Sequence, residues 1–131
     1  MKLNGHAIVF VPDGKKETEG IARTTHLAIS AHEDDIEFMA YAPIAECFGK
    51  TDKWFGGVVV TDGAGSPRRG LYADYTDEQM KTASVGEYGF LALLGHPSSQ
   101  VKNPADRDII AELAEIIRAA KPKYIYAQSC G

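Results

Sequence analysis

The chain has 131 residues with a net charge of −4, and 44% of the residues are hydrophobic. This length suits one domain with its own core, and the absence of basic clusters argues against a nucleic-acid partner. The two cysteines form no Cys-x-x-Cys pattern, and the chain has no apolar signal core. No run approaches the roughly 20 apolar residues of a membrane helix. These features predict a cytoplasmic protein without a membrane partner.

The first half of the chain alternates apolar, β-branched runs with polar segments. A tight turn of proline, aspartate and glycine closes the first of these runs. In chain order, the pattern predicts a strand at Ala7–Val11, a loop at Lys15–Gly20, a strand at Thr25–Ala31, a helix from Asp34 to Cys47 that kinks or restarts at its internal proline, and a strand at Trp54–Thr61.

The second half continues the alternation and contains the clearest helix of the sequence. In that helix, isoleucine and leucine recur at helical spacing, with acidic residues near the start and basic residues near the end. The pattern predicts a loop at Asp62–Gly70, a mostly helical segment at Asp77–Leu94, a connection at His96–Pro104, a helix at Ala105–Ala120 and a final core strand at Lys123–Ala127.

Strands that alternate with helices predict a single α/β domain over residues 1–131, with a mostly parallel sheet and helices on both faces. In such sheets, ligands bind beyond the carboxyl ends of the strands. Two polar segments take that position in the sequence, Ala31–Asp35 and Asp62–Arg69. We therefore expect the functional residues in these two segments.

The segment after the second predicted strand concentrates acidic side chains and one histidine. His32 and Asp35 are three positions apart, which places them on one face if the chain turns helical. An imidazole nitrogen and a carboxylate oxygen on one face can bind Zn²⁺ or another divalent cation, and Asp34 beside them could take a proton from metal-bound water. The spacing leaves a second interpretation open, in which the acidic residues cap a helix and the histidine pairs with a carboxylate.

The same segment also has a family resemblance. Ala31–Phe38 resembles the Ala-His-Pro-Asp-Asp-x-Glu signature of the LmbE-like (PIG-L) family of zinc-dependent N-deacetylases. The resemblance extends over nearly all of the chain after about residue 24. Further stretches that fit one bacterial branch of the family are Val59–Ser66, Gly70–Tyr72, Val85–Tyr88, Pro97–Lys102 and, in pattern, Ile109–Ala127.

This resemblance implies a Rossmann-like domain, incomplete at its carboxyl terminus, that hydrolyses an N-acetyl group from an amino sugar or sugar conjugate. His32 and Asp35 correspond to two of the three zinc ligands, and Asp34 corresponds to the general base that activates the zinc-bound water. The implied cofactor is Zn²⁺ or another divalent cation. The implied partner is a small N-acetylated sugar; a homo-oligomer is left open.

Three residues of the second polar segment are further candidates for the substrate site. Arg68 or Arg69 could reach a polar or anionic group of the substrate, and Asp62 closes the preceding strand at the same edge. Each also has an ordinary interpretation, since a solvated basic turn and a strand-end aspartate are common without any ligand.

The sequence departs from the family pattern in three ways. Glu33 replaces the usual proline, the Arg-x-x-Glu pair expected after the glycine-rich loop is absent, and the third histidine ligand would follow the last residue, Gly131. We expect His96 to be a surface or loop histidine, His26 a packed strand residue, and Cys130 no zinc ligand. These departures favour a fragment of a longer deacetylase; a site completed by another subunit and a degenerate paralogue stay open.

A second function remains open beside the hydrolase. The same α/β frame could serve a non-catalytic sugar or nucleotide binder, with the backbone N–H groups of Asp62–Ser66 contacting a phosphate. That loop matches neither a P-loop nor a Gly-x-Gly-x-x-Gly fingerprint.

Overall fold

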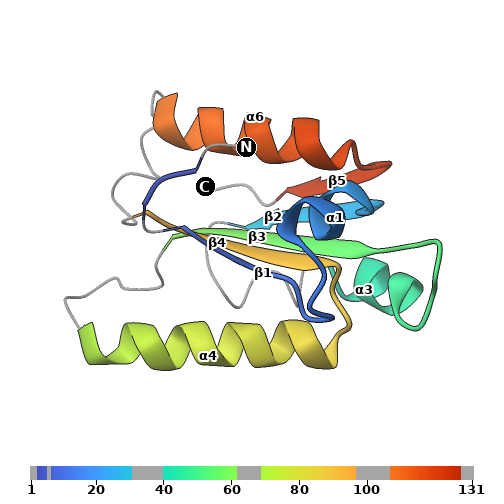
Figure 1. Cartoon of the computed structure of the whole chain (residues 1–131), viewed down its shortest axis with the longest axis horizontal. Helices are drawn as coiled ribbons and strands as arrows, with labels where there is room; N and C mark the ends of the chain where they lie inside the picture. The colour runs from blue at the N-terminus through green and yellow to red at the C-terminus, as the bar shows by residue number, and fades with distance from the viewer. Residues whose placement is uncertain (1–2, 6, 31–39, 62–68, 97–106, 128–131) are drawn as a thin grey trace.

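The fold is a five-stranded sheet between two layers of helices, seen in a computed structural model (Figure 1). The structure describes residues 3–5, 7–30, 40–61, 69–96 and 107–127, with the backbone alone for 69–76. The elements are β1 (Ile8–Phe10), α1 (Glu17–Ala22), β2 (His26–Ser30), α3 (Tyr41–Cys47), β3 (Phe55–Thr61), α4 (Arg69–Val85), β4 (Phe90–His96), α6 (Arg107–Ala120) and β5 (Tyr124–Ala127).

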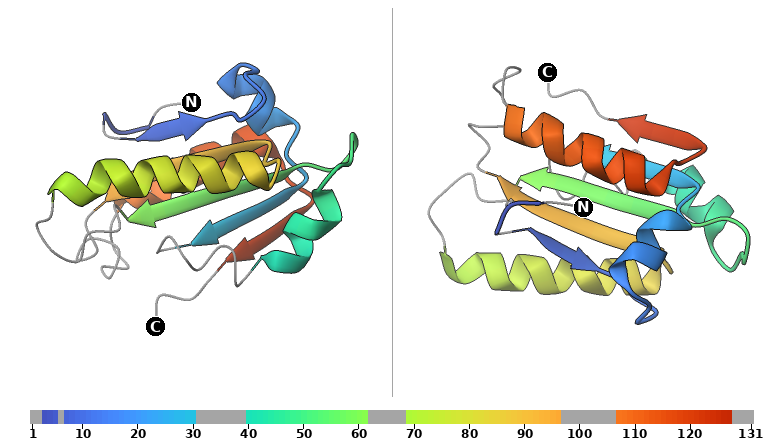
Figure 2. Two further views of the ribbon diagram at one scale, coloured as in Figure 1. Left: turned by 90° about the horizontal axis from the view of Figure 1, so that it is seen from below. Right: turned by 45° about the horizontal axis from the view of Figure 1, so that its top comes forward.

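The strand order is β1-β4-β3-β2-β5, and four of the five strands run parallel. β1 is the exception, since it pairs antiparallel with β4. From β2 the chain steps to β3 and then to β4, after which α6 carries it back to the far side of β2, where β5 pairs (Figure 2). The predicted α/β class with a mostly parallel sheet is therefore confirmed.

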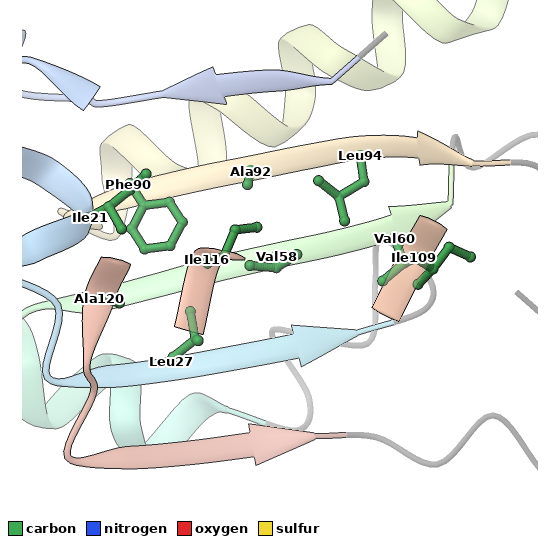
Figure 3. Close-up of a cluster of buried hydrophobic side chains, with 10 residues drawn as sticks. All are labelled: Ile21, Leu27, Val58, Val60, Phe90, Ala92, Leu94, Ile109, Ile116 and Ala120. Carbon is green, nitrogen blue, oxygen red and sulfur yellow. The ribbon is translucent and has the colours of Figure 1, made fainter. Parts of the chain in front are cut away.

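Both faces of the sheet are covered, as predicted. On one face, α1 and α6 pack over a cluster that alternate residues of the strands supply; Val58 and Val60 point to this side (Figure 3). Val59, between them, belongs to the opposite cluster, together with Cys47 of α3 and Ala83 of α4. Every residue of β3 is buried, as expected of a central strand with helices on both sides.

Two segments have a different secondary structure from the one predicted. The helical interpretation of Asp77–Leu94 is wrong in its second half, because α4 ends at Val85 and Phe90 begins the buried strand β4. The break lies at Glu87, whose φ of 53° is left-handed and ends a helix. An unbroken apolar run such as Phe90–Leu94 suits a strand buried on both faces as well as a helix, so periodicity alone does not separate them.

Smaller differences concern the element ends. The loop predicted at Lys15–Gly20 includes most of the short helix α1, which buries Ile21. The loop predicted to reach Gly70 is wrong at its end, because α4 begins at Arg69. In the described part of the expected Asp34–Cys47 helix, Pro43 lies in the first turn of α3, where proline is tolerated.

The predicted final strand exists as β5, but it is an edge strand and not a core strand. β5 lies at the end of the strand order, and the side chains of Tyr124 and Ile125 are about half exposed. Within the described ranges, no helix combines the length and apolar character that crossing a membrane requires.

Candidate functional site at the carboxyl edge of the sheet

The carboxyl ends of the parallel strands meet at one edge of the sheet. Ser30 ends β2 and pairs in register with Val59, two positions before β3 ends at Thr61. Thr61 in turn pairs with His96, the last residue of β4. Ser30 and Thr61 are fully buried, so the chain leaves the sheet here from a rigid, packed frame.

This edge contains a point where the connections change direction. β2 connects onward to β3 on one side, whereas β5 lies on its other side and is reached only after β4 and α6. In open α/β sheets, ligands bind outside the carboxyl ends of the strands at such a point. The end of β2 is therefore the position in this fold where a ligand site is most expected.

The residues predicted to do the chemistry follow these strand ends in the sequence. His32, Asp34 and Asp35 come soon after β2, and Asp62 comes directly after β3. These four residues and Arg68 lie outside the described residues. Arg69 is described by its backbone alone, as the first residue of α4. The mutual geometry of these six residues therefore stays a prediction.

One constellation at this edge lies within the described residues, and the sequence analysis missed it. His96 Nε2 lies 2.5 Å from Oε1 of Glu112 on α6, and only 7% of His96 and 5% of Glu112 is exposed. The other carboxylate oxygen, Oε2, accepts hydrogen bonds from the backbone N–H of Asn4 at 3.1 Å and from its side-chain amide at 2.8 Å. Three distant parts of the chain thus meet at the end of β4.

This constellation corrects the interpretation of His96 as a surface or loop histidine. The residue is a buried strand end, because β4 extends to it and Glu112 supplies a polar partner in the core. A sequence signal existed for Glu112. It lies three positions after Ile109 and four before Ile116, both buried on the same helix face. A carboxylate at a core position of an amphipathic helix needs a buried partner.

His26 is a packed strand residue, as predicted, and it lies far from this edge. It begins β2, at the amino end, where its Nδ1 lies 2.8 Å from the hydroxyl of Thr25. Its Nε2 is 3.5 Å from Oε2 of Glu46, within ion-pair distance but without the geometry of a hydrogen bond. Nearby, burial raises the pKa of the Cys47 thiol. This cluster therefore belongs to the packing of α3 on the sheet.

A concavity lined by described residues lies at the amino edge. It measures about 210 Å³ and is lined by Pro12, Asp13, Trp54, Ser84, Glu87 and Tyr88. Among the described side chains, no three His, Cys, Asp or Glu residues are arranged to hold a metal ion. The concavity lies at the opposite edge from the strand ends that the predicted residues follow in the sequence.

Comparisons with known proteins do not assign this chain to a family, so its structural class follows from the fold alone. No protein-family model, curated protein or solved structure matches this chain. The architecture defines an α/β protein with a mostly parallel sheet, and the polar chemistry of its sequence follows the carboxyl ends of β2 and β3.

Proposed function

We propose that this chain is a Rossmann-like domain of a cytoplasmic, zinc-dependent N-deacetylase that acts on an N-acetylated amino sugar or sugar conjugate. One observation carries the proposal. The sequence His32-Glu33-Asp34-Asp35 begins two residues after the end of β2, the strand at which the sheet connections change direction. The resemblance of this segment to the LmbE-like signature supplies the reaction class.

The donor set suits the proposed cofactor. Imidazole nitrogen and carboxylate oxygen are common ligands of Zn²⁺, and His32 and Asp35 would supply one of each. When bound, zinc would polarise the amide carbonyl and lower the pKa of a bound water. Two protein ligands are fewer than the three typical of catalytic zinc, so we expect this chain to hold the ion weakly.

The remaining residues have proposed roles in the hydrolysis itself. Asp34 takes a proton from the attacking water, whose oxygen forms a bond to the amide carbonyl carbon; the C–N bond then breaks and the proton passes to the leaving nitrogen, so that the products are acetate and a free amine. Arg68 or Arg69 contacts a polar group of the sugar, with Asp62 at the same side of the site. The segments that carry these side chains follow the ends of β2 and β3, and buried apolar residues hold both strands in place.

The test separates metal binding from turnover in the full chain. Zinc affinity is measured by isothermal titration, and acetate release from N-acetylglucosamine conjugates is measured in parallel. We expect His32→Ala and Asp35→Ala to weaken zinc binding by at least about 10-fold, as expected for loss of a direct ligand. Asp34→Asn should retain zinc and lose most of the turnover, about 100-fold or more.

Glu115→Ala is the matched control, because it removes a partly exposed carboxylate on α6. It should change neither quantity. Unchanged zinc affinity in both His32→Ala and Asp35→Ala would overturn the assignment. Tight nucleotide binding that does not depend on zinc would instead favour a non-catalytic binding domain.

A further inference from the structure

The concavity at the amino edge of the sheet has the size of a small ligand. It is enclosed by the turn after β1, the residue before β3, and the end of α4 with the turn that follows it (Figure 1). Its volume is about 210 Å³. A cavity of roughly 150 Å³ holds one benzene molecule. The concavity therefore has room for a small organic molecule.

The walls of the concavity are mostly apolar and are held in place by neighbouring side chains. Pro12, Trp54 and Tyr88 contribute their rings to the lining. The guanidinium of Arg23 lies 3.8 Å from the centroid of the Trp54 ring. Tyr88 is only 4% exposed, and its ring packs edge-on against that of Phe55. Such walls suit the apolar part of a ligand, whose orientation is then set by the polar groups.

Two polar side chains of the lining already donate their hydrogens within the protein. The hydroxyl of Ser84 donates to the carbonyl oxygen of Met80 at 3.0 Å, and the indole N–H of Trp54 donates to the carbonyl oxygen of Thr51 at 3.3 Å. A hydroxyl has one hydrogen but also two lone pairs, so the Ser84 oxygen can still accept. Neither side chain can donate to a ligand without losing its present bond.

Two carboxylates also line the concavity, and they differ in their partners. Asp13 accepts bonds of 2.6 and 3.0 Å from the guanidinium of Arg23, which balances its charge. The carboxylate of Glu87 has no hydrogen bond or ion pair with the residues that the structure describes. Carboxylates only accept hydrogen bonds. The lining therefore offers acceptors, together with one negative charge that no described cation balances.

The backbone gives Glu87 a position that is usually held by glycine. Two bonds close the end of α4, from the N–H of Glu87 to the carbonyl oxygen of Ser84 at 3.2 Å and from the N–H of Tyr88 to that of Ala83 at 3.0 Å. In this helix ending, glycine adopts the left-handed conformation at least cost, whereas Glu87 has it here with a φ of 53°. Strained residues of this kind concentrate at functional sites. Glycine would serve the helix end better, so the carboxylate itself needs another explanation.

We propose that this concavity binds a small organic ammonium ion. Its N–H groups are donated to the carboxylate of Glu87 and the hydroxyl oxygen of Ser84, and its apolar part lies against Trp54 and Tyr88. Charge complementarity selects this occupant, because a neutral molecule would cover the Glu87 carboxylate without pairing it and an anion would be repelled. The site lies at the opposite edge from the strand ends that the predicted deacetylase residues follow, so the inference does not rest on the proposed function.

The chain has a single tryptophan, which makes binding at this site directly observable. The full ¹⁵N-labelled chain is titrated with benzylamine at neutral pH, where the amine is protonated, and the indole N–H signal of Trp54 is followed by NMR. We expect a saturable shift with a Kd on the order of 1 mM, which suits a ligand of so few atoms. The absence of a saturable shift would overturn the proposal.

Benzyl alcohol is the matched ligand, because it keeps the ring but replaces the ammonium group with a neutral hydroxyl. It should bind at least about 5-fold more weakly than benzylamine, since hydrogen bonds to a carboxylate are stronger from a charged donor. Equal affinities of the two compounds would overturn the recognition of a cation.

Two substitutions at Glu87 separate binding from folding. Glu87→Gln keeps the size of the side chain and should raise the Kd for benzylamine about 10-fold, as expected for the loss of a charge-assisted hydrogen bond. Glu87→Gly should weaken binding at least as much, yet leave the midpoint of urea unfolding unchanged or higher, because glycine relieves the left-handed backbone.

Glu115→Gln is the matched control, because it neutralises a partly exposed carboxylate on α6, away from the concavity. It should change neither the Kd nor the unfolding midpoint. An unchanged Kd for benzylamine in Glu87→Gln would overturn the proposal.

Discussion

The guanidinium of Arg23 lies over the ring of Trp54, 3.8 Å from its centroid. Arg23 also makes two bonds to the carboxylate of Asp13, at 2.6 and 3.0 Å, and one of 3.0 Å to the carbonyl of Gly89. One side chain thus joins the turn after β1, the start of β3 and the start of β4. These contacts fasten the amino edge of the sheet, opposite the candidate site.

Arg23→Lys should destabilise the fold by about 1–2 kcal/mol, because lysine keeps the charge but loses the planar, two-pronged contact and the stacking on Trp54. Urea unfolding followed by circular dichroism measures the change. Arg118→Lys is the matched control. Its guanidinium is exposed and, among the described residues, pairs with Glu115 at 3.4 Å, so a change below about 0.5 kcal/mol is expected. Equal effects of the two substitutions would contradict this role of Arg23.

The Asp13–Arg23 pair should make stability depend on acidity. Hydrogen bonds from Arg23 lower the pKa of Asp13 below its ordinary value of 3.8. Asp13 has a lower pKa in the folded than in the unfolded chain. Its ion pair with Arg23 therefore adds to the free energy of unfolding above the unfolded pKa, and this addition is lost as the pH falls through the folded pKa.

The experiment compares the wild type with Asp13→Asn in urea unfolding, from pH about 7 to about 2. Asp13 is partly exposed, so the difference at neutral pH should be about 0.5–1 kcal/mol. It should shrink as Asp13 is protonated. A constant difference over the whole range would show that the charge of Asp13 does not contribute.

Gly56 in β3 has no room for a side chain. A Cβ atom there would lie 2.3 Å from Cε1 of Phe90, whose ring is fully buried. We expect Gly56→Ala to destabilise the protein by about 1–3 kcal/mol, the usual cost of overpacking a dense core. Gly5→Ala is the control, because a Cβ there meets nothing within 4 Å. Thermal unfolding of both variants checks this, and similar melting temperatures would refute the packing at Gly56.

Glu112→Ala should cost about 2–3 kcal/mol, because it removes the buried carboxylate that accepts two N–H bonds from Asn4 and contacts the ring nitrogen of His96. Glu115→Ala, one turn further along α6 and partly exposed, should change the free energy of unfolding by less than about 0.5 kcal/mol. Chemical denaturation measures both. If Glu112→Ala were as mild as its control, the constellation at the end of β4 would not be a structural element.

The sequence predicted correctly those helices and strands whose hydrophobic pattern fits only one type of secondary structure. The helix expected at Ala105–Ala120 is α6, because its apolar residues recur at helical spacing and face the sheet. The strands β2, β3 and β5 match short β-branched or aromatic runs. β4 was predicted to be part of a helix, because an apolar run without alternation suits a buried helix as well as a strand that is covered on both faces.

Only those residues of the candidate site that are neighbours in the sequence could be predicted. The motif from His32 to Asp35 is contiguous, so its chemistry can be inferred from neighbouring letters. The contact between His96 and Glu112 depends on α6 packing over the end of β4, which no local pattern contains. A carboxylate on the apolar face of α6 was the available sign of a buried partner.

The hydrogen bonds between Asn4 and Glu112 join residues 108 positions apart in the chain. During synthesis on the ribosome, the amino-terminal segment must therefore wait for α6 to emerge before these bonds can form. Contacts of such long range slow folding, since the closure of a large loop precedes any gain. The end of β4 should accordingly be among the last regions to acquire amide protection in a refolding experiment followed by pulsed hydrogen exchange.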